Sequence, residues 1–411
     1  MKSAPTGILP AIMTNVCLIG ISGFGRVHYD NLLHAVARGD VRLRAATVIN
    51  QPDEPEKCQC LRELGCELFK DHRAMLAAHG RHTDLCVIPT GIHFHAPMTI
   101  DALRAGANVF VEKPAAAVIQ DVRAMQAAER ATGKFVAVGF QDLYCEVTHW
   151  MKRLVADGRL GQLRSLRIRG IWPRPDTYYT RNSWAGRQRV GDAWILDAPF
   201  HNAFAHHLNL LCFLAGEPLQ SVEAELYRTR DIESPDTACL RIRTATGVPL
   251  LLIITHASEP ETHPELTVTG TRDTLLWKYS HSARLASGET MKCETVEALR
   301  DRMLQMVCRR VTDPTAFVCD LNLAGNEVLC ANAAFESSPV HPIPASQIQR
   351  IPFNDSTLSV VTGLAELVQR AYVEEKLFSE LDVPWAQHGR VVSLTGYDRY
   401  PRPPARCGHR E

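Results

Sequence analysis

The stretch from Val16 to His28 constrains the fold of this chain more than any other part of the sequence. An apolar run ends in the glycine-rich turn Gly20-Ile-Ser-Gly-Phe-Gly25, and a segment with a helical pattern follows. A nucleotide pyrophosphate site needs this order, because glycines let the backbone approach the phosphates and a helix N-terminus favours their charge. Read as G-x-G-x-x-G, the motif has Ser22 at its middle position and an extra glycine at Gly23. The predicted turn residues of a dinucleotide site are Gly20, Ser22, Gly23, Phe24 and Gly25.

The order of strands and helices around this motif indicates whether it is a dinucleotide-binding turn or only a turn after a strand. Short apolar segments alternate with helical ones between residues 15 and 140. The expected strands cover residues 15–20, 41–49, 85–88, 108–111 and 135–138. Such alternation implies parallel pairing with helices on both faces, and the ligand then lies at the carboxyl ends of the strands. The pattern therefore favours a dinucleotide-binding domain.

The pattern changes after residue 140. Segments 240–243 and 248–255 flank Thr244-Ala-Thr-Gly247, and a second hairpin follows at 266–279, which suggests an antiparallel sheet. The fold class we predict is α/β: an N-terminal Rossmann doubly wound parallel sheet, then a C-terminal α+β domain with a large, mainly antiparallel open sheet. The predicted parts are an N-terminal tail (1–14), a dinucleotide-binding Rossmann domain (15–140), a substrate-binding and oligomerisation domain (141–385) and a C-terminal arm (386–411).

Composition excludes several classes of partner. The 45 basic and 45 acidic residues balance, and no stretch concentrates Lys and Arg, so neither a nucleic acid nor a membrane partner is favoured. The 13 cysteines are odd in number and scattered through apolar segments, which is typical of reduced thiols and predicts a cytoplasmic protein. Cys58, Cys60 and Cys66 lack the spacing of a zinc site, and we predict no metal.

The residue at the end of the second strand bears on the cofactor. An acidic residue there is typical of NAD sites, because a carboxylate accepts hydrogen bonds from the ribose hydroxyls. Here the position holds Asn50, which can bond a hydroxyl but adds no charge, and no Lys or Arg follows until Lys57. We expect NAD or NADP, with NAD slightly favoured, and Asn50 in the site; alternatively, Asn50 only caps a loop.

Four further motifs occur in order along the chain: Pro89-Thr-Gly-Ile-His-Phe-His95, Val109-Phe-Val-Glu-Lys-Pro114, Asp157-Gly-Arg-Leu-Gly161 and Gly191-Asp-Ala-Trp-Ile-Leu-Asp-Ala-Pro-Phe-His201. Together with the glycine turn, they resemble the glucose–fructose oxidoreductase/inositol dehydrogenase (Gfo/Idh/MocA) family over residues 15 to 380. The sequence departs from the family pattern at Ser22, at Pro199, which stands where a glycine is usual, and at Phe204, which stands where a second Asp often follows.

The resemblance implies roles for residues of the first two motifs. The loop after the fourth strand lies along the cofactor, which implicates Thr90, His93 and His95, and Glu112 with Lys113 follow beside the nicotinamide. The Lys113 ammonium could hydrogen-bond the reacting hydroxyl and stabilise a developing alkoxide, and the Lys113–Pro114 bond could be cis. Alternatively, Lys113 is an exposed lysine paired with Glu112.

The last motif supplies the other candidate catalytic residues, Asp197 and His201. A helix is expected over 197–214, and a spacing of four would place both residues on one helical face. His201 is the candidate general base, since imidazole titrates near neutral pH, and Asp197 would contact a substrate hydroxyl or position Lys113. His206 is an alternative base, and a third possibility is that neither histidine is the base.

The segment 172–187 is dense in aromatic, guanidinium and amide side chains, a mixture that suits a polyhydroxylated ligand. Its alternative role is a loop that covers the sheet edge or forms an oligomer contact. The candidate substrate-binding residues are Tyr179, Arg181, Asn182 and His206.

These observations predict an NAD(P)-dependent oxidoreductase that acts on a secondary alcohol of a sugar, polyol or sugar derivative. Two alternatives stay open: a glycosidase that uses NAD transiently, and a non-catalytic regulatory protein that keeps the fold and senses a sugar or cofactor. The resemblance further implies a carbohydrate-like small-molecule substrate and a homodimer or homotetramer.

Overall fold

The computed structural model describes residues 13–403. The chain forms two compact units, and each contains segments that are distant in the sequence. The first unit takes in the described parts of Met1–Glu112, Met125–Ala137 and Arg300–Val318. The second takes in Lys113–Ala124, Val138–Leu299 and the described part of Cys319–Glu411.

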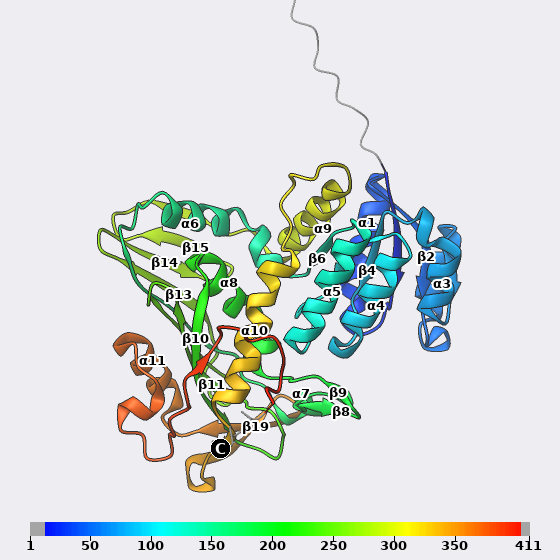
Figure 1. The fold of residues 1–411 in the computed structure, drawn as a ribbon. Coiled ribbons are helices and arrows are strands. Elements are labelled where there is room, and N and C mark those ends of the chain that lie inside the picture. The colour runs from blue at the N-terminus through cyan, green and yellow to red at the C-terminus, as the bar shows by residue number, and fades with distance from the viewer. Residues whose placement is uncertain (1–12, 404–411) are drawn as a thin grey trace, which may run out of the picture. The chain divides into compact units, whose positions relative to one another are not determined.

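The first unit is built on a six-stranded sheet with the order β3-β2-β1-β4-β5-β6, and its strands pair in parallel (Figure 1). Its strands are β1 (Thr14–Ile19), β2 (Val41–Thr47), β3 (Glu67–Phe69), β4 (Leu85–Ile88), β5 (Asn108–Val111) and β6 (Val136–Val138). Its connecting helices are α1 (Gly25–Arg38), α2 (Pro55–Glu63), α3 (His72–His79) and α4 (Ile92–Arg104), together with the part of α5 (Ile119–Thr132) that begins at Met125. The strand order reverses between β1 and β4, where a doubly wound sheet opens its ligand crevice.

The second unit contains a ten-stranded mixed sheet, in which β7–β12 and β10–β17 pair in parallel and the other recorded pairs are antiparallel. Its strands are β7 (Leu163–Ile171), β10 (Leu219–Arg228), β11 (Thr237–Thr244), β12 (Pro249–Thr255), β13 (Thr262–Gly270), β14 (Thr274–Lys278), β15 (Ser282–Leu285), β16 (Thr290–Lys292), β17 (Val340–Pro342) and β20 (Val392–Ser393). Two small hairpins pair β8 (Arg189–Val190) with β9 (Ala193–Trp194) and β18 (Ile348–Phe353) with β19 (Ser356–Val361). Its helices are α6 (Glu146–Ala156), α7 (Asp176–Thr180), α8 (Ala205–Ala215), α10 (Leu321–Ser337) and α11 (Leu364–Glu374), and only the start of α9 (Val296–Thr312) belongs to it. The predicted fold class and both predicted hairpins are confirmed.

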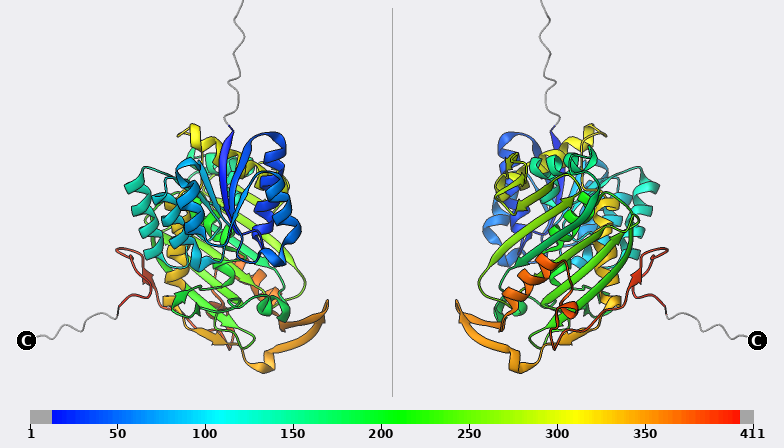
Figure 2. Two further views of the ribbon diagram at one scale, coloured as in Figure 1. Left: turned by 90° about the vertical axis from the view of Figure 1, so that its right-hand side faces the viewer. Right: turned by 90° about the vertical axis from the view of Figure 1, so that its left-hand side faces the viewer.

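Helix α11 lies across one face of the large sheet, as the right-hand view of Figure 2 shows in orange. Its apolar residues Leu364 and Val368 belong to one buried cluster with Ile171 of β7 and Leu251 of β12. Charged contacts add to this packing: Arg167 on β7 forms an ion pair with Glu375, directly after the helix. The chain's own C-terminal segment therefore covers this part of the sheet.

The units differ from the domain limits expected from sequence, first because residues 113–124 of the expected dinucleotide-binding domain belong to the second unit. Residues 300–318, which carry most of α9, belong to the first unit, whereas the sequence placed all of 141–385 in the second. Of the expected C-terminal arm, the described residues 386–403 fold onto the second unit, where β20 pairs with β10 and the Tyr397 hydroxyl donates to Glu336 at 2.9 Å. Residues 1–12 of the expected N-terminal tail and residues 404–411 lie outside the described residues. No helix of the described chain is long and apolar enough to cross a bilayer.

Candidate functional site

The glycine turn has the geometry that a pyrophosphate requires. Gly20 and Gly23 adopt left-handed φ values of 96° and 56°. A Cβ on Gly25 would lie only 2.9 Å from the carbonyl oxygen of Gly20, so this close approach of strand end and helix start excludes a side chain. Helix α1 begins at Gly25 and has no acidic residue in its first turn, which leaves its dipole available to an anion. The residues present fit a dinucleotide, although Ser22 replaces the middle glycine.

Asn50 lies beside this turn. Its side-chain amide donates to the Ser22 hydroxyl at 3.1 Å, and the hydroxyl lies 3.3 Å from the Asn50 carbonyl oxygen. Asn50 is the cap residue of a short 3-10 helix but makes no side-chain cap bond, so capping does not account for its side chain. The amide therefore links the end of the second strand to the glycine turn.

An acidic residue that the sequence reasoning did not select also lies here. Glu54 forms an ion pair with Lys57 at 2.7 Å, and hydrogen bonds from Lys57 and then Ser22 hold the pKa of this carboxyl below its usual value. Lys57 also donates to the carbonyl oxygen of Ile21 at 3.1 Å. The turn thus lies beside the Glu54 carboxylate and the Lys57 ammonium, whose charges neutralise each other. These residues follow Asn50, the ribose contact expected from sequence, by four and seven positions.

The loop after β4 places Thr90 next to the turn, since a Cβ on Gly20 would contact the Thr90 methyl group at 3.7 Å. His95 is buried, and its Nε2 lies 3.1 Å from the Thr90 carbonyl oxygen, so this histidine holds the loop. The His93 ring packs against Phe94 with ring centres 3.9 Å apart, and burial lowers the pKa of His93. Of the three predicted residues, Thr90 lies nearest the glycines.

Phe24 and Glu112 were the other predicted cofactor residues of this unit. Phe24 is 48% exposed in the turn. Glu112 is buried at the end of β5, and its carboxylate lies 2.7 Å from Nε2 of His28 on α1. The Glu112 carboxylate therefore joins α1 to the strand end.

Lys113 belongs to the second unit, and its ammonium contacts Asn202. The Nζ atom donates to the backbone oxygen of Asn202 at 2.9 Å and to its side-chain oxygen at 3.2 Å. The Lys113–Pro114 bond is cis, as expected. Lys113 is half-buried rather than exposed, and the contacts recorded for its ammonium are those to Asn202.

Asp197 completes a chain of contacts with Lys113. The Asn202 amide donates to Asp197 Oδ1 at 2.7 Å, the Gly186 amide donates to Oδ2 at 2.7 Å, and the Arg181 guanidinium lies 3.7 Å from Oδ2. Burial raises the pKa of Asp197, while the Gly186 amide, Arg181, Asn202 and Lys113 oppose this rise. Asp197 therefore acts on Lys113 through Asn202, a residue that sequence reasoning left unassigned.

His201 and Asp197 do not share a helical face, which corrects the sequence-based expectation. Residues Pro199–His201 form a 3-10 turn, and α8 begins only at Ala205. Pro199 explains the difference, because the residue before a proline is driven out of the helical region, and Ala198 is indeed extended. The two side chains consequently point to different partners.

The partner of His201 is Glu327 on α10. Nδ1 of His201 lies 2.8 Å from Glu327 Oε1, and both side chains are fully buried. Nε2 of His201 and the second oxygen of Glu327 are buried without a hydrogen-bond partner among the described residues. When the Glu327 oxygen accepts the hydrogen bond, Nδ1 of His201 is its donor, and in the neutral ring the lone pair is then on Nε2.

The predicted substrate-binding residues differ in the contacts that their side chains make within the protein. The Arg181 guanidinium stacks on the Tyr178 ring at 3.7 Å as well as approaching Asp197. Tyr179 packs against Arg230, with a buried hydroxyl and a pKa that burial raises well above its usual value. Asn182 accepts hydrogen bonds from the amides of Trp184 and Ala185, so its carbonyl group serves the loop itself. His206 is half-buried, with its ring edge-on to Phe140 at 5.5 Å.

Phe204, at a departure from the family pattern, is the centre of an aromatic stack. Its ring lies 4.5 Å from Trp172 and 5.5 Å from His256. A Cβ on Gly170 would come within 2.6 Å of the Phe204 ring, so Gly170 makes room for this side chain. An apolar ring therefore fills the position where the family pattern often has a carboxylate.

His207 and His256 flank this stack and should make stability depend on pH. Burial lowers the pKa of His207 to about 3 and that of His256 well below its usual value. Below about pH 6.5 these histidines bind a proton in the unfolded chain but stay neutral in the folded chain. Each histidine should therefore lower the free energy of unfolding by about 1.4 kcal/mol for each unit by which the pH falls. Urea unfolding between pH 7 and pH 4 should show this loss.

The variant His207→Phe isolates one of these contributions. It should flatten the pH dependence of the unfolding free energy, whereas His82→Gln, at an exposed position, should leave the dependence unchanged. An unaltered pH dependence in His207→Phe would contradict the proposed effect of burial.

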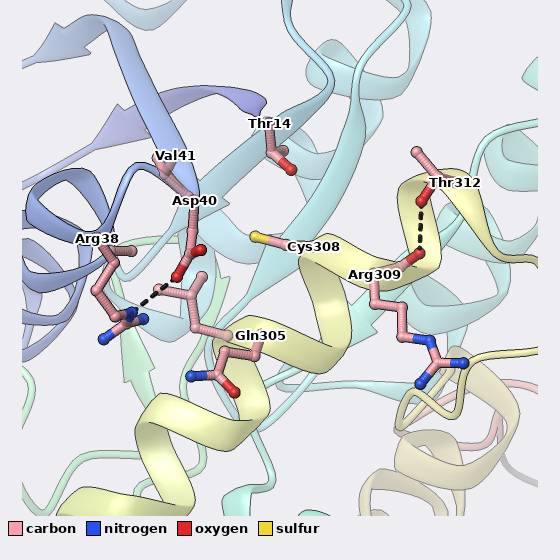
Figure 3. Close-up of a pocket in the computed structure, with 10 residues that line it drawn as sticks. Thr14, Arg38, Asp40, Val41, Gln305, Cys308, Arg309 and Thr312 are labelled. Atoms are coloured by element: carbon pink, nitrogen blue, oxygen red, sulfur yellow. Dashed lines mark hydrogen bonds and ion pairs between the residues drawn. The ribbon is translucent and has the colours of Figure 1, made fainter. Parts of the chain in front are cut away.

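A surface pocket of about 520 Å³ lies elsewhere in the first unit (Figure 3). It is bordered by Thr14 at the start of β1, Val41 at the start of β2, and Cys308 on α9. These are the amino ends of the strands, opposite the glycine turn, and no candidate residue lines the pocket. Among residues 13–403 no group of three or more His, Cys, Asp or Glu side chains is placed to hold a metal ion.

Two family models match the chain. A model described as "Oxidoreductase family, NAD-binding Rossmann fold" matches residues 14–140, and one described as "GFO/IDH/MocA C-terminal domain" matches residues 148–276. Together they cover more than half of the 411 residues. The first match identifies the unit that carries the glycine turn as an NAD-binding Rossmann fold.

Curated relatives include inositol dehydrogenases. The inositol 2-dehydrogenase/D-chiro-inositol 3-dehydrogenase of Halalkalibacterium halodurans is 25% identical over 235 residues, which are 56% of this chain and 62% of the relative. The inositol 2-dehydrogenase of Pseudomonas savastanoi pv. phaseolicola is 26% identical over 243 residues, 56% and 64% of the two chains. The chain thus spans less than two thirds of the length of these relatives.

Solved structures share the fold. The WlbA dehydrogenase from Bordetella pertussis, in complex with NADH and UDP-GlcNAcA, superposes with a TM-score of 0.64 at 23% identity, over 81% of this chain and 99% of that one. Levoglucosan dehydrogenase, in complex with NADH, gives a TM-score of 0.68 at 17% identity, over 85% and 99%.

Proposed function

Because the chain belongs to the Gfo/Idh/MocA family of oxidoreductases, we propose that it transfers a hydride between a nicotinamide cofactor and a secondary alcohol of a sugar, polyol or sugar derivative. The observation that carries the proposal is the chain of contacts from Lys113 through Asn202 to Asp197. The names of the inositol and levoglucosan dehydrogenases support a polyol or sugar as the substrate class.

The cofactor, when bound, supplies the hydride acceptor. The Lys113 ammonium donates a hydrogen bond to the reacting hydroxyl and stabilises its developing negative charge. Asn202 fixes the direction of this ammonium, and Asp197 fixes Asn202. His201 takes the hydroxyl proton on Nε2, while Glu327 stabilises the imidazolium that forms. His206 is the alternative base.

The proposed activity is tested by absorbance in the reduced-nicotinamide band. Purified protein is offered NAD and, separately, NADP, each with a panel of sugars, polyols and sugar acids. Growth of the band with one substrate class would establish the oxidoreductase. A flat trace with cofactor bound by calorimetry would overturn it, and a chromogenic glycoside would then separate a glycosidase from a regulatory protein.

The base is assigned by comparing His201→Ala with His206→Ala. We expect His201→Ala to lose at least about 100-fold in kcat, the lower end of the usual effect of general-base catalysis. His206→Ala should retain most of the activity. The reverse order would move the base to His206.

We also propose that NAD is preferred over NADP, because the Glu54 carboxylate lies at the ribose end of the turn. A 2′-phosphate there would meet the Glu54 carboxylate, which also occupies the Lys57 ammonium and so keeps it from pairing with the phosphate. Glu54→Gln should therefore lower the Kd for NADP by about tenfold, or ~1.4 kcal/mol, with a smaller change for NAD. The matched control is Asp53→Asn, an exposed neighbour. Equal effects of the two variants in calorimetry would contradict a ribose role for Glu54.

The oligomer remains a proposal as well. We propose a homodimer or homotetramer, and α11 limits where its interface can lie: α11 already packs on β7 and β12, whereas Lys278 of β14 and Arg284 of β15 are exposed. Sedimentation equilibrium decides between a single chain and an oligomer. A cytoplasmic location is proposed from the 13 scattered cysteines.

A further inference from the structure

An arginine from a distant part of the sequence lies beside the glycine turn. Arg300 is in α9 and begins the segment Arg300–Val318, which belongs to the first unit together with the turn. Its guanidinium carbon lies 5.7 Å from the centre of the Phe24 ring, and Phe24 is the cap residue at the N-terminus of α1. Arg300 lies outside the two segments that the family models match, 14–140 and 148–276. The matched segments therefore do not account for this contact.

No carboxylate is paired with Arg300 among the described residues, although other charged residues of α9 have partners. Asp301 lies 2.8 Å from Arg38, and Arg309 lies 3.0 Å from Asp313. The Nε atom of Arg300 is buried without a hydrogen-bond partner in the part of the chain that the structure describes. A buried donor without an acceptor costs free energy, which a ligand with acceptor oxygens would recover. The guanidinium is therefore available to an anion.

Helix α9 holds the backbone of Arg300 in place. Asp301, the next residue, pairs with Arg38, which is the last residue of α1. Met303 on the same helix is buried. The guanidinium itself lies over the Phe24 ring, in the arrangement of a cation–π pair. This contact gives the exposed Phe24 ring a role in the turn, because it directs the charge of Arg300 toward the start of α1.

The charges around the start of α1 favour an anion. The first turn of this helix contains no acidic residue. Of the carboxylates farther along, Asp30 pairs with Arg26 at 3.6 Å, and Glu112 at the end of β5 contacts His28 at 2.7 Å. A guanidinium here adds to the positive end of the helix dipole, and its planar donors match two oxygens of a phosphate. Arg300 thus has the chemistry of a phosphate-binding residue.

We propose that Arg300 binds the pyrophosphate of the nicotinamide dinucleotide, with the Phe24 ring supporting its guanidinium. The inference rests on the proposed function, because it requires a dinucleotide on the glycine turn. The pyrophosphate is the group expected at a helix N-terminus, and Phe24 caps that terminus. The 2′-phosphate of NADP belongs instead to the ribose end of the turn, where Asn50 and Glu54 lie. Arg300 should therefore serve NAD and NADP equally.

The test is calorimetric titration of the full-length protein with NAD and, separately, with NADP. Arg300→Gln should raise the Kd for both cofactors by the same factor, about tenfold or more, because it removes a charge-assisted hydrogen bond to phosphate. Arg300→Lys keeps the positive charge and should recover part of the loss. The matched control is Arg309→Gln, which removes an exposed arginine of the same helix and should bind both cofactors as the wild type does.

The outcomes separate this inference from the proposed function. An unchanged Kd for NAD in Arg300→Gln would overturn the inference and leave the proposed function standing. A loss confined to NADP would assign Arg300 to the 2′-phosphate and would overturn it as well. Failure of the wild type to bind either cofactor would overturn both.

The support from Phe24 is tested by a double-mutant cycle. Phe24→Leu keeps an apolar side chain but removes the ring face, so it should raise the Kd for NAD by about two- to fivefold. In an Arg300→Gln background the same change should have little effect, because the guanidinium that the ring supports is gone. Equal effects in the two backgrounds would contradict the proposed pairing of Phe24 with Arg300.

Discussion

Lys113→Ala is expected to lower kcat by about 10²–10⁴-fold while the Kd for NAD changes little. The ammonium is the group we expect to stabilise the alkoxide, and its recorded contacts are with Asn202 and not with residues of the glycine turn. Stopped-flow or steady-state absorbance measures the first quantity, and calorimetry measures the second.

Lys292→Ala is the matched control for Lys113, because it removes an exposed lysine at the end of β16. Its kcat should equal that of the wild type. If Lys113→Ala also kept its kcat, Lys113 would have no part in the chemistry. A parallel loss of NAD affinity would place the lysine in cofactor binding.

The second large effect is expected at Glu327. Glu327→Gln should lower kcat by about 100-fold, because a neutral amide cannot stabilise the imidazolium that His201 becomes. Glu327→Ala should also lose about 1–3 kcal/mol of unfolding free energy, since the buried Nδ1 hydrogen of His201 is left without an acceptor. Urea unfolding measures the stability of each variant.

A double-mutant cycle separates the catalytic from the structural role of Glu327. In a His201→Leu background the further change Glu327→Gln should have almost no effect on the residual kcat, because the group that Glu327 acts on is gone. Glu366→Gln, an exposed acidic residue on α11, is the control and should behave as the wild type. Equal losses of kcat in both backgrounds would rule out action through His201.

The glycine turn, the alternation of strands and helices and the hairpins could be predicted because their signals are local. Gly20 and Gly25 lie within one turn, and the residues that flank Thr244-Ala-Thr-Gly247 pair with each other. The prediction of a helix over 197–214 was wrong for its first residues, because α8 begins only at Ala205. Pro199 was a local signal against a helix there.

The residues missed by sequence reasoning are those whose roles depend on distant partners. Asn202 is 89 positions from Lys113, and Glu327 is 126 positions from His201. Nothing in their own neighbourhoods marks an amide or a carboxylate as functional. Glu54 was missed for another reason. The usual pattern has the acidic residue at the end of the second strand, whereas here the 3-10 turn Gln51–Asp53 comes between Asn50 and Glu54.

The docking of residues 386–403 has a practical consequence for anyone who shortens this protein. Tyr397 accepts a bond from Arg123 of α5 and donates one to Glu336 of α10, and the Arg402 amide bonds the same Glu336. A chain cut at residue 385 would leave Glu336 without these donors and would strip β20 from the edge of β10. Affinity tags and truncations are therefore best placed beyond residue 403.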